Sequence, residues 1–425
     1  MSQDISLIDD TITEIVGRIW QSADLVDDLH DLCDTGGRVA GTDSELAARA
    51  LLKDKLRQIS DTATIHTFPV SGRVTLDHSV QLIDATGPVT LQTTALLNSP
   101  ATDGPIDLEV VDLGRGTRGD FEAAASLIPG RAVLVRHEFP FTTGHIHRGI
   151  KYGWAVEAGA AAFLIANNLP DVGPISGSGG SGVDSDIPGI GMSYESGRRL
   201  ATAAARGQAG IRIDLTSEQR SWTAENLVLD LPGRTDEVIT LTAHYDGHSL
   251  GESAMDNGSG IAVVLEVARR LQPVVSQLRR GIRVLFFTFE EWSLTGSERY
   301  LEDLSEEEKA LIRFNINVDT PVGHPRLNVL TAGDADLEEL ARRTGAAGGA
   351  PVGVVRAPTS NSDHYNFLRA GIPAARLIGG YDDPTAVSRY LLSAADTRDK
   401  VEPADLRAAA MSTAVLVLHA CNYEG

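Results

Sequence analysis

The chain has 425 residues, of which 42% are hydrophobic and 22% are charged, and its formal net charge is −21. This length exceeds what one hydrophobic core usually serves, so we expect two domains. The excess of acidic residues disfavours partners such as nucleic acid or an anionic membrane.

The N-terminal sequence MSQDISLIDDTITEIV lacks the basic stretch and apolar segment of a secretory signal, so we expect a cytoplasmic protein. No apolar run approaches the roughly 20 residues that span a bilayer. The cysteines Cys33 and Cys421 lie outside any metal-ligand spacing. We interpret them as reduced structural thiols.

The first segments of the chain predict helices. One helix is expected within residues 5–32, and residues 42–59 have the apolar spacing of an amphipathic helix. Thr42 and Glu45 have the spacing of a capping box at its start.

From about residue 75 to 218 short strands alternate with helices and loops. Strands are predicted at 107–112, 131–136, 161–165 and 210–215, helices at 150–158 and 194–205, and a Gly/Ser-rich loop at 173–185. His145, His147 and Arg148 share one loop, where we interpret them as ordinary surface residues. No acid–base or metal cluster is evident in this segment.

After residue 224 the pattern becomes a strand–helix alternation. Helix 261–271 is expected among strands predicted at 238–243, 282–289, 315–318, 327–330 and 374–378. The near-continuous apolar run at 282–289 is typical of a strand that is buried on both faces. The sequence therefore predicts an α/β fold with a mixed, mostly parallel sheet flanked by helices.

Histidine and carboxylate side chains gather at the predicted strand ends. Sites in open α/β sheets form beyond the carboxyl ends of the strands. Successive segments bring His244 with Asp246, Asp256, Glu290 with Glu291, and Asp319 to that edge.

These residue types suit a metal site. One imidazole and several carboxylates are ligands for Zn²⁺, or less selectively for Mn²⁺ or Co²⁺. A carboxylate can bridge two metal ions about 3.5–4 Å apart. Side chains alternate along a strand, so Glu290 and Glu291 are expected to point apart, one toward metal and one toward water as a general base. Each residue alone has a structural explanation, such as a helix cap for Asp256, but their joint occurrence favours metal binding.

Four segments resemble the zinc-dependent aminopeptidase family that includes bacterial leucyl aminopeptidases and the glutamate carboxypeptidases. The matching text is AHYDGHSLGESAMDNGSG (243–260), FTFEEWSLTGSERY (287–300), NVDT (317–320) and SDHYNFLRAGIPA (362–374). The resemblance implies a zinc exopeptidase-like domain formed by residues 1–75 and 219–425.

The intervening segment, residues 76–218, resembles an inserted, mainly-β protease-associated domain. The text that carries this likeness is GRAVLVR (130–136), IKYGWAVEAGAAAFLIAN (150–167) and IPGIGMS (187–193). The resemblance implies a lid or an element that controls substrate access.

The resemblance also implies roles for single residues. His244 and Asp319 would hold one zinc ion, Asp256 would bridge two ions, and Glu291 would hold the second. Glu290 would be the general base that takes a proton from water. Asp246 would orient His244 through its other ring nitrogen. The implied reaction is the hydrolysis of N-terminal peptide bonds in a peptide substrate.

One expected ligand is missing. Members of the family normally have a stretch similar to YHTxxDTxDK near the end of the domain. This chain reads YLLSAADTRDK at 390–400, so Leu392 stands where the family has a metal-binding histidine. His248 or His364 could substitute for it, or the enzyme could work with one tightly bound ion. For His364, a substrate-pocket or structural role is the preferred interpretation.

Two other functions stay open at this point. The fold could serve a binding or scaffold protein without catalysis, as in the transferrin receptor ectodomain, or a single-zinc glutaminyl cyclase. A glutaminyl cyclase fits less well, because those relatives also have the histidine-containing stretch that this chain lacks. Substrate preference and oligomeric state, including a homodimer, are not readable from the sequence.

Overall fold

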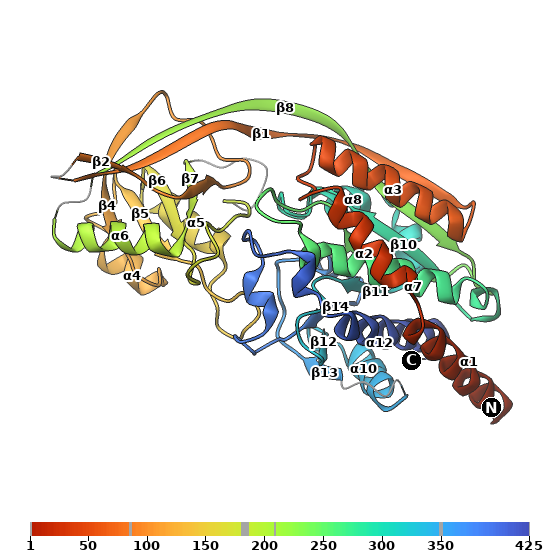
Figure 1. Cartoon of the computed structure of the whole chain (residues 1–425). Coiled ribbons are helices and arrows are strands. Elements are labelled where there is room, and N and C mark those ends of the chain that lie inside the picture. The colour runs from red at the N-terminus through yellow and green to blue at the C-terminus, as the bar shows by residue number, and fades with distance from the viewer. Residues whose placement is uncertain (1, 85–86, 180–186, 208–209, 348–351, 425) are drawn as a thin grey trace.

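The computed structural model of the chain describes residues 2–84, 87–179, 187–207, 210–347 and 352–424. It has two lobes (Figure 1). The larger lobe contains both the N-terminal helices and the C-terminal half of the chain. The smaller lobe is formed by the part of the sequence that connects the strands β1 (Ala63–Asp84) and β8 (Gly210–Leu231).

The larger lobe is built on a mixed sheet with the strand order β13-β12-β14-β11-β9-β10-β8. Its central strands β14, β11, β9 and β10 are parallel, and β8 and β12 run antiparallel to their neighbours in this central group. The remaining bounds are β9 (Val238–His244), β10 (Gly281–Phe287), β11 (Ile312–Val318), β12 (Leu327–Leu330), β13 (Val352–Val355) and β14 (Ala374–Gly379). The predicted mixed, mostly parallel sheet is therefore confirmed.

Both faces of this sheet are covered by helices. Side chains alternate along β10, so that Val284 and Phe286 join one buried cluster while Leu285 and Phe287 join another. The first cluster packs against α1 (Ser2–Trp20), α2 (Asp24–Asp34), α3 (Asp43–Ile59), α7 (Gly260–Leu271), α10 (Ala335–Ala347) and α12 (Pro403–Asn422). The second packs against α8 (Thr295–Asp303) and α11 (His364–Arg369). The short helix α9 (Glu306–Ala310) precedes β11.

The capping box predicted at the start of α3 does not form. Thr42 is the N-cap residue, but its hydroxyl donates a hydrogen bond backward to the Val39 carbonyl at 2.6 Å. Glu45 is buried and accepts a hydrogen bond from the Thr288 hydroxyl at 3.2 Å. The Glu45 side chain thus bonds to a residue that is distant in the sequence instead of capping the start of α3.

The smaller lobe contains its own parallel strands. Strands β4 (Ile106–Asp112), β5 (Ala132–Arg136), β6 (Ala162–Ala166) and β7 (Gly189–Met192) are parallel neighbours, and β3 (Thr93–Ala95) pairs antiparallel with β7. Helices α4 (Arg118–Ala123), α5 (Arg148–Glu157) and α6 (Tyr194–Ala205) accompany them. The predicted loop at 173–185 lies partly outside the described residues.

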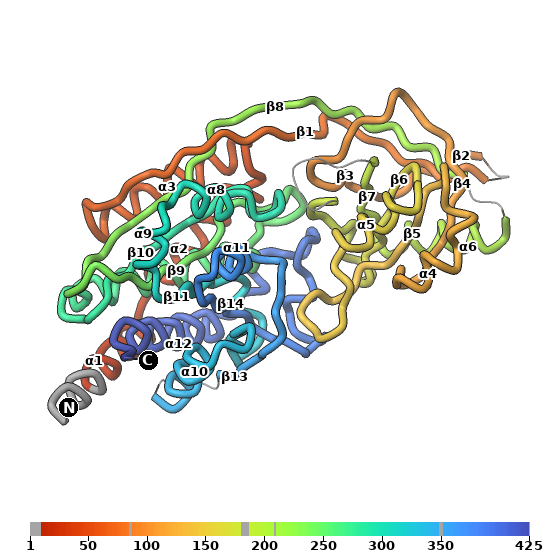
Figure 2. The backbone as a smooth tube through the Cα atoms, turned by 180° about the vertical axis from the view of Figure 1, so that it is seen from behind, coloured from red at the N-terminus to blue at the C-terminus, as the bar shows by residue number. Residues whose placement is uncertain are grey.

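Two long strands join the lobes. β1 and β8 each have 22 residues and pair antiparallel from one lobe into the other, as both views show (Figures 1 and 2). One end of β8 pairs with β4 and the other end pairs with β10. β2 (Gly87–Thr90) pairs with the far end of β1. The predicted domain limits at 76 and 218 therefore fall within continuous strands, beside a register shift between Thr75 and Asp77.

Helix α12 is the one described helix that is long and apolar enough to cross a membrane, judged by length and composition. Of its most apolar window, 72% is buried within the structure, where α12 contacts α1, α7 and α10. The same length and composition are found in core helices of globular domains, and these contacts explain the apolar sequence.

Candidate metal centre

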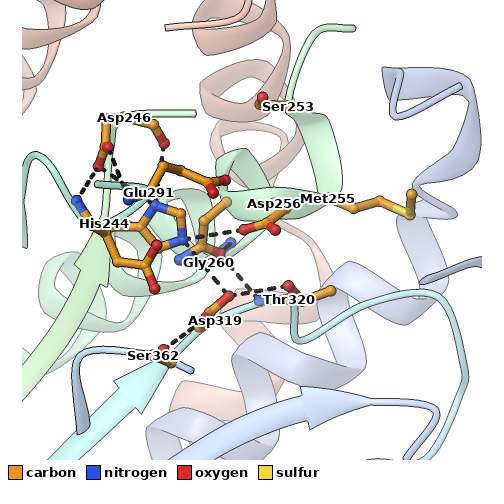
Figure 3. A network of polar contacts seen from close by, with 12 residues as sticks. His244, Asp246, Ser253, Met255, Asp256, Gly260, Glu291, Asp319, Thr320 and Ser362 are labelled. Carbon is orange, nitrogen blue, oxygen red and sulfur yellow. Dashed lines mark hydrogen bonds and ion pairs between the residues drawn. The ribbon is translucent and has the colours of Figure 1, made fainter. Parts of the chain in front are cut away.

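Three side chains converge beyond the carboxyl ends of β9 and β11. His244 Nε2 lies 3.1 Å from Asp256 Oδ1 and 3.7 Å from Asp319 Oδ1 (Figure 3). Each residue offers one ligand atom, and these atoms lie within 4.8 Å of one another. An imidazole nitrogen and two carboxylate oxygens fit Zn²⁺ and leave a coordination position free for water or substrate.

A buried arginine positions Asp319. Arg376 Nη2 lies 3.0 Å from Asp319 Oδ2, which also accepts a short hydrogen bond from the Ser362 hydroxyl. Burial alone would raise the pKa of Asp319, but Arg376 and His244 together hold it below its usual range. The ion pair uses Oδ2, so Oδ1 remains directed at His244, and the arginine does not block the centre.

His244 is oriented mainly by the backbone of Asp246. Its Nδ1 lies 3.1 Å from the Asp246 carbonyl oxygen and 3.7 Å from the carboxylate Oδ1. The sequence assigned this orienting role to the Asp246 side chain. Burial disfavours the imidazolium, but Glu290 and the hydrogen-bonded carboxylates raise the pKa of His244 well above its usual value in the metal-free protein.

The Asp246 carboxylate instead holds the segment that carries the two glutamates. It accepts hydrogen bonds from the backbone amides of Glu290 at 3.0 Å and Glu291 at 3.2 Å. Strand β10 ends at Phe287, so both glutamates lie in the turn that follows it. The alternation of side chains along a strand, from which we predicted that the two glutamates point apart, therefore does not apply to them. The two hydrogen bonds to the Asp246 carboxylate hold this turn in place.

Glu290 and Glu291 both line the cavity above the centre and are 8% exposed. The Glu291 Oε1 atom is buried and has no hydrogen-bond partner among the described residues. Burial and the neighbouring charge of Asp256 raise the pKa of Glu291 to about 7. An unpartnered carboxylate oxygen beside Asp256 is a suitable cation ligand.

Asp256 lies in a turn that leads into α7. The turn spans Ala254–Ser259, and the peptide bond between Asp256 and Asn257 is cis. Asp396 accepts hydrogen bonds from the backbone amides of Met255 at 2.8 Å and Asp256 at 3.3 Å. The matching Asp-Thr text at 396–397 identified this aspartate, but its function of supporting the Asp256 backbone was not predicted.

Leu392 lines the cavity together with Asp256 and Glu291, and its side chain offers no ligand atom. His248, suggested as its substitute, is fully buried, and neither ring nitrogen has a hydrogen-bond partner among the described residues. Its Nε2 lies 3.9 Å from Asp396 Oδ2. His248 thus lies near Asp396. It is neither among the residues that line the cavity nor part of the group formed by His244, Asp256 and Asp319.

His364 does not line the cavity, although its neighbour Tyr365 does. Its Nε2 lies 3.1 Å from the Thr359 hydroxyl oxygen, and burial lowers the pKa of the imidazole to about 3. The sequence analysis left a substrate-pocket or a structural role open for His364, and this position supports the structural role. The adjacent Asp363, which the sequence interpretation left without a function, is fully buried, and burial raises its pKa to about 7.

A cavity of about 600 Å³ covers the centre and is lined by both lobes. From the smaller lobe, His137, His147, Arg148 and Trp154 line the same cavity as Asp256, Glu290 and Glu291. Arg148 is 6% exposed, so its interpretation as a surface residue was wrong. The local sequence pattern could not show that this side chain packs on Gly177 and donates a hydrogen bond to the Ser178 carbonyl.

Comparison with known proteins agrees with this architecture. Residues 226–417 match peptidase family M28, and residues 88–200 match the PA domain. The chain is 26% identical over 395 residues to aminopeptidase YwaD of Bacillus subtilis strain 168, covering 92% of this chain and 82% of that protein. It is 30% identical to the probable leucine aminopeptidase 2 of Trichophyton verrucosum over 59% of this chain, but spans only 51% of that relative.

Solved structures show the same arrangement. BSAP, a zinc aminopeptidase from Bacillus subtilis, superposes with a TM-score of 0.74 at 25% identity and covers 94% of this chain and 95% of its own. A peptidase M28 precursor from Shewanella amazonensis SB2B shares the fold with a TM-score of 0.81 at 21% identity, over 99% and 98% of the two chains. Residues 226–417 thus match the model of peptidase family M28 and residues 88–200 match that of the PA domain, as the resemblance in the sequence predicted.

Proposed function

We propose that the chain is a zinc-dependent aminopeptidase that hydrolyses N-terminal peptide bonds. The observation that carries this proposal is the convergence of His244, Asp256 and Asp319 beneath a cavity that Glu290 also lines. Aminopeptidase YwaD and BSAP, which resemble the chain over most of its length, are named for this activity.

The residues have distinct functions in this proposal. His244, Asp319 and Asp256 would hold the ion, and Glu291 would contribute a further negative charge beside Asp256. When bound, Zn²⁺ acts as a Lewis acid that polarises a carbonyl group and makes water nucleophilic at neutral pH. Mn²⁺ or Co²⁺ would suit the same donor set less selectively.

Glu290 accepts the proton of the attacking water and passes it to the leaving amine. Its backbone amide donates a hydrogen bond to Asp246, and Glu290 lines the same cavity as Asp256 and Asp319. A proton acceptor must lie within hydrogen-bond reach of the water it activates, and this arrangement places a carboxylate beside the centre.

A second candidate function follows from Leu392. Its apolar side chain lies where the family resemblance expects a ligand, which favours a binding protein with impaired catalysis on the same fold. Such a protein would keep the cavity as a peptide-binding site without turnover.

One assay separates the two candidates. The full chain is freed of metal, and release from aminoacyl-anilides is measured with and without added Zn²⁺, Mn²⁺ or Co²⁺. Metal-dependent release that is lost in Glu290→Gln supports the aminopeptidase, with Glu306→Gln on the exposed face of α9 as the matched control. A folded chain that binds peptide without any metal-dependent release would support the binding protein.

A further inference from the structure

The family resemblance implies a second metal position, and in this chain that position lacks its histidine because Leu392 replaces it. Asp256 and Glu291 remain there with Leu392 beside them in the cavity wall, and Glu291 Oε1 has no described hydrogen-bond partner. The described residues contain one group of metal-ligand spacing, and it is the triad around His244. Two neighbouring carboxylates, of which Glu291 is buried and Asp256 is partly buried, favour a compensating positive charge, since an uncompensated buried charge is costly.

A buried arginine of the smaller lobe lines the same cavity. Arg148 is the first residue of α5, and its Nε donates a hydrogen bond to the Ser178 carbonyl at 2.6 Å. Its guanidinium packs closely on Gly177, where an added Cβ would lie 2.1 Å from Nη2. Gly177 has a φ of 105°, so both its conformation and this close approach favour glycine.

The segment 176–178, which includes Gly177 and Ser178, also contacts Leu392. The Ser176 amide donates a hydrogen bond to the Leu392 carbonyl at 2.8 Å, two residues before the carbonyl that holds Arg148. Residues 176–178 therefore connect the position of the missing ligand to the arginine. Leu392 also packs against a buried cluster of the smaller lobe, so the replacement and the arginine belong to one interface.

Electrostatics agree with this geometry. Burial lowers the pKa of Arg148, whereas Glu291, Glu290 and Asp256 raise it, in that order of strength. A guanidinium stays protonated in proteins and is more weakly hydrated than an ammonium group, so it suits a buried position opposite carboxylates.

We propose that the Arg148 guanidinium supplies the positive charge that a second ion would give beside Asp256 and Glu291, so that this chain holds a single tightly bound Zn²⁺ and the smaller lobe completes its active site. The inference rests on the proposed zinc site around His244. This inference differs from the idea that His248 replaces the missing ligand. It assigns the positive charge beside Asp256 and Glu291 to the Arg148 side chain instead of a second metal ion.

The test counts zinc ions in four forms of the full chain: wild type, Leu392→His, Arg148→Met and the double variant. Each is loaded with Zn²⁺, passed through gel filtration and analysed by mass spectrometry, and the affinity for each ion is measured by calorimetry. Arg131→Met, which removes an arginine from a partly exposed ion pair in the same lobe, is the matched control. Thermal melting confirms that each variant is folded.

We expect one ion in the wild type and in the Arg131→Met control. The double variant should bind two, because it regains the histidine and loses the repelling cation. Leu392→His alone should bind its second ion at least tenfold more weakly than the double variant. In the wild type, aminopeptidase activity should follow occupancy of the first ion.

Two tightly bound ions in the wild type would overturn the inference while leaving the proposed function intact. Equal affinity of Leu392→His for the second ion with and without Arg148 would also overturn it. If Arg148→Met does not fold, the wild type and Leu392→His still decide the question, because strong binding of a second ion by Leu392→His contradicts a guanidinium at that position. Absence of any bound zinc would refute the proposed function as well.

Discussion

Arg376 and Asp319 form an ion pair in which both side chains are almost fully buried, with Nη2 and Oδ2 3.0 Å apart. The guanidinium also lies over the Phe141 ring, 5.1 Å from its centroid, and Phe141 comes from the smaller lobe. The pair therefore connects a metal-ligand candidate of the larger lobe to the segment that covers it.

Replacing Arg376 should destabilise the metal-free protein more than the zinc-bound protein. Breaking a buried ion pair costs about 3–5 kcal/mol, because the remaining charge is uncompensated. Bound Zn²⁺ would offset part of this cost by binding Asp319. In Arg376→Met we expect a lower melting temperature and a larger gain on zinc addition than in the wild type.

The matched control is Arg313→Met, which removes a half-buried partner of Asp336. Loss of such a pair costs about 0–1 kcal/mol. Its gain on zinc addition should equal that of the wild type. An equal gain in Arg376→Met would contradict the prediction.

Glu290→Gln should reduce kcat and leave metal binding unchanged. General base catalysis contributes about 10²–10⁴-fold, and Glu290 is not one of the three converging residues. Steady-state kinetics and the zinc content of the same preparation check both parts. Loss of the ion together with activity would instead identify Glu290 as a ligand.

Asp246→Asn should weaken catalysis through the turn that carries the glutamates. The carboxylate accepts two amide hydrogen bonds, whereas an asparagine side chain presents an NH₂ group to one of them. We expect kcat/KM to fall about 10–100-fold, the range seen for supporting residues of metal sites. Asp112→Asn, in the smaller lobe, is the control, and an unchanged kcat/KM in Asp246→Asn would contradict this function.

His147 should make stability depend on pH. Its Nδ1 accepts a hydrogen bond from the Gly149 amide at 3.2 Å, which requires the unprotonated nitrogen. Burial, together with the charge of Arg148, lowers the pKa of His147 to about 3. The unfolded chain binds this proton below about pH 6.5, so the stabilisation is lost as pH falls from 6.5 toward 3, by at most about 1.4 kcal/mol per pH unit.

Unfolding by urea at pH 7 and pH 5 measures this dependence. His147→Ser keeps a side chain that can cap α5 but does not titrate, so its stability should change less between the two pH values. His30→Ser, at an exposed position, is the control and should change as the wild type does. An identical change in His147→Ser and the wild type would refute the prediction.

The sequence predicted the parts of the site that depend on local patterns. Apolar runs located β9, β10 and β11, polar residues at or just after strand ends located His244 and Asp319, and the segment before the next predicted helix located Asp256. This succeeded because parallel strands bring their carboxyl ends to one edge of a sheet.

The sequence did not reveal contacts between distant segments. Arg376 stands inside a strand, and Arg148 is the first residue of helix α5 in the other lobe, so neither has a local signal for its position. Glu45 was assigned to a helix cap, yet a contact with Thr288 buries it. These contacts depend on how the lobes and layers pack, which residue spacing does not encode.

The paired strands β1 and β8 constrain how the cavity can open. At roughly 3.3 Å per residue, 22 residues extend about 70 Å, and the two strands stay hydrogen-bonded from one lobe to the other. A swinging motion about a loose linker would have to break that ladder. Entry of a peptide should therefore rely on flexing of the ribbon near the register shift at Thr75 and Asp77, which favours small displacements and slender substrates.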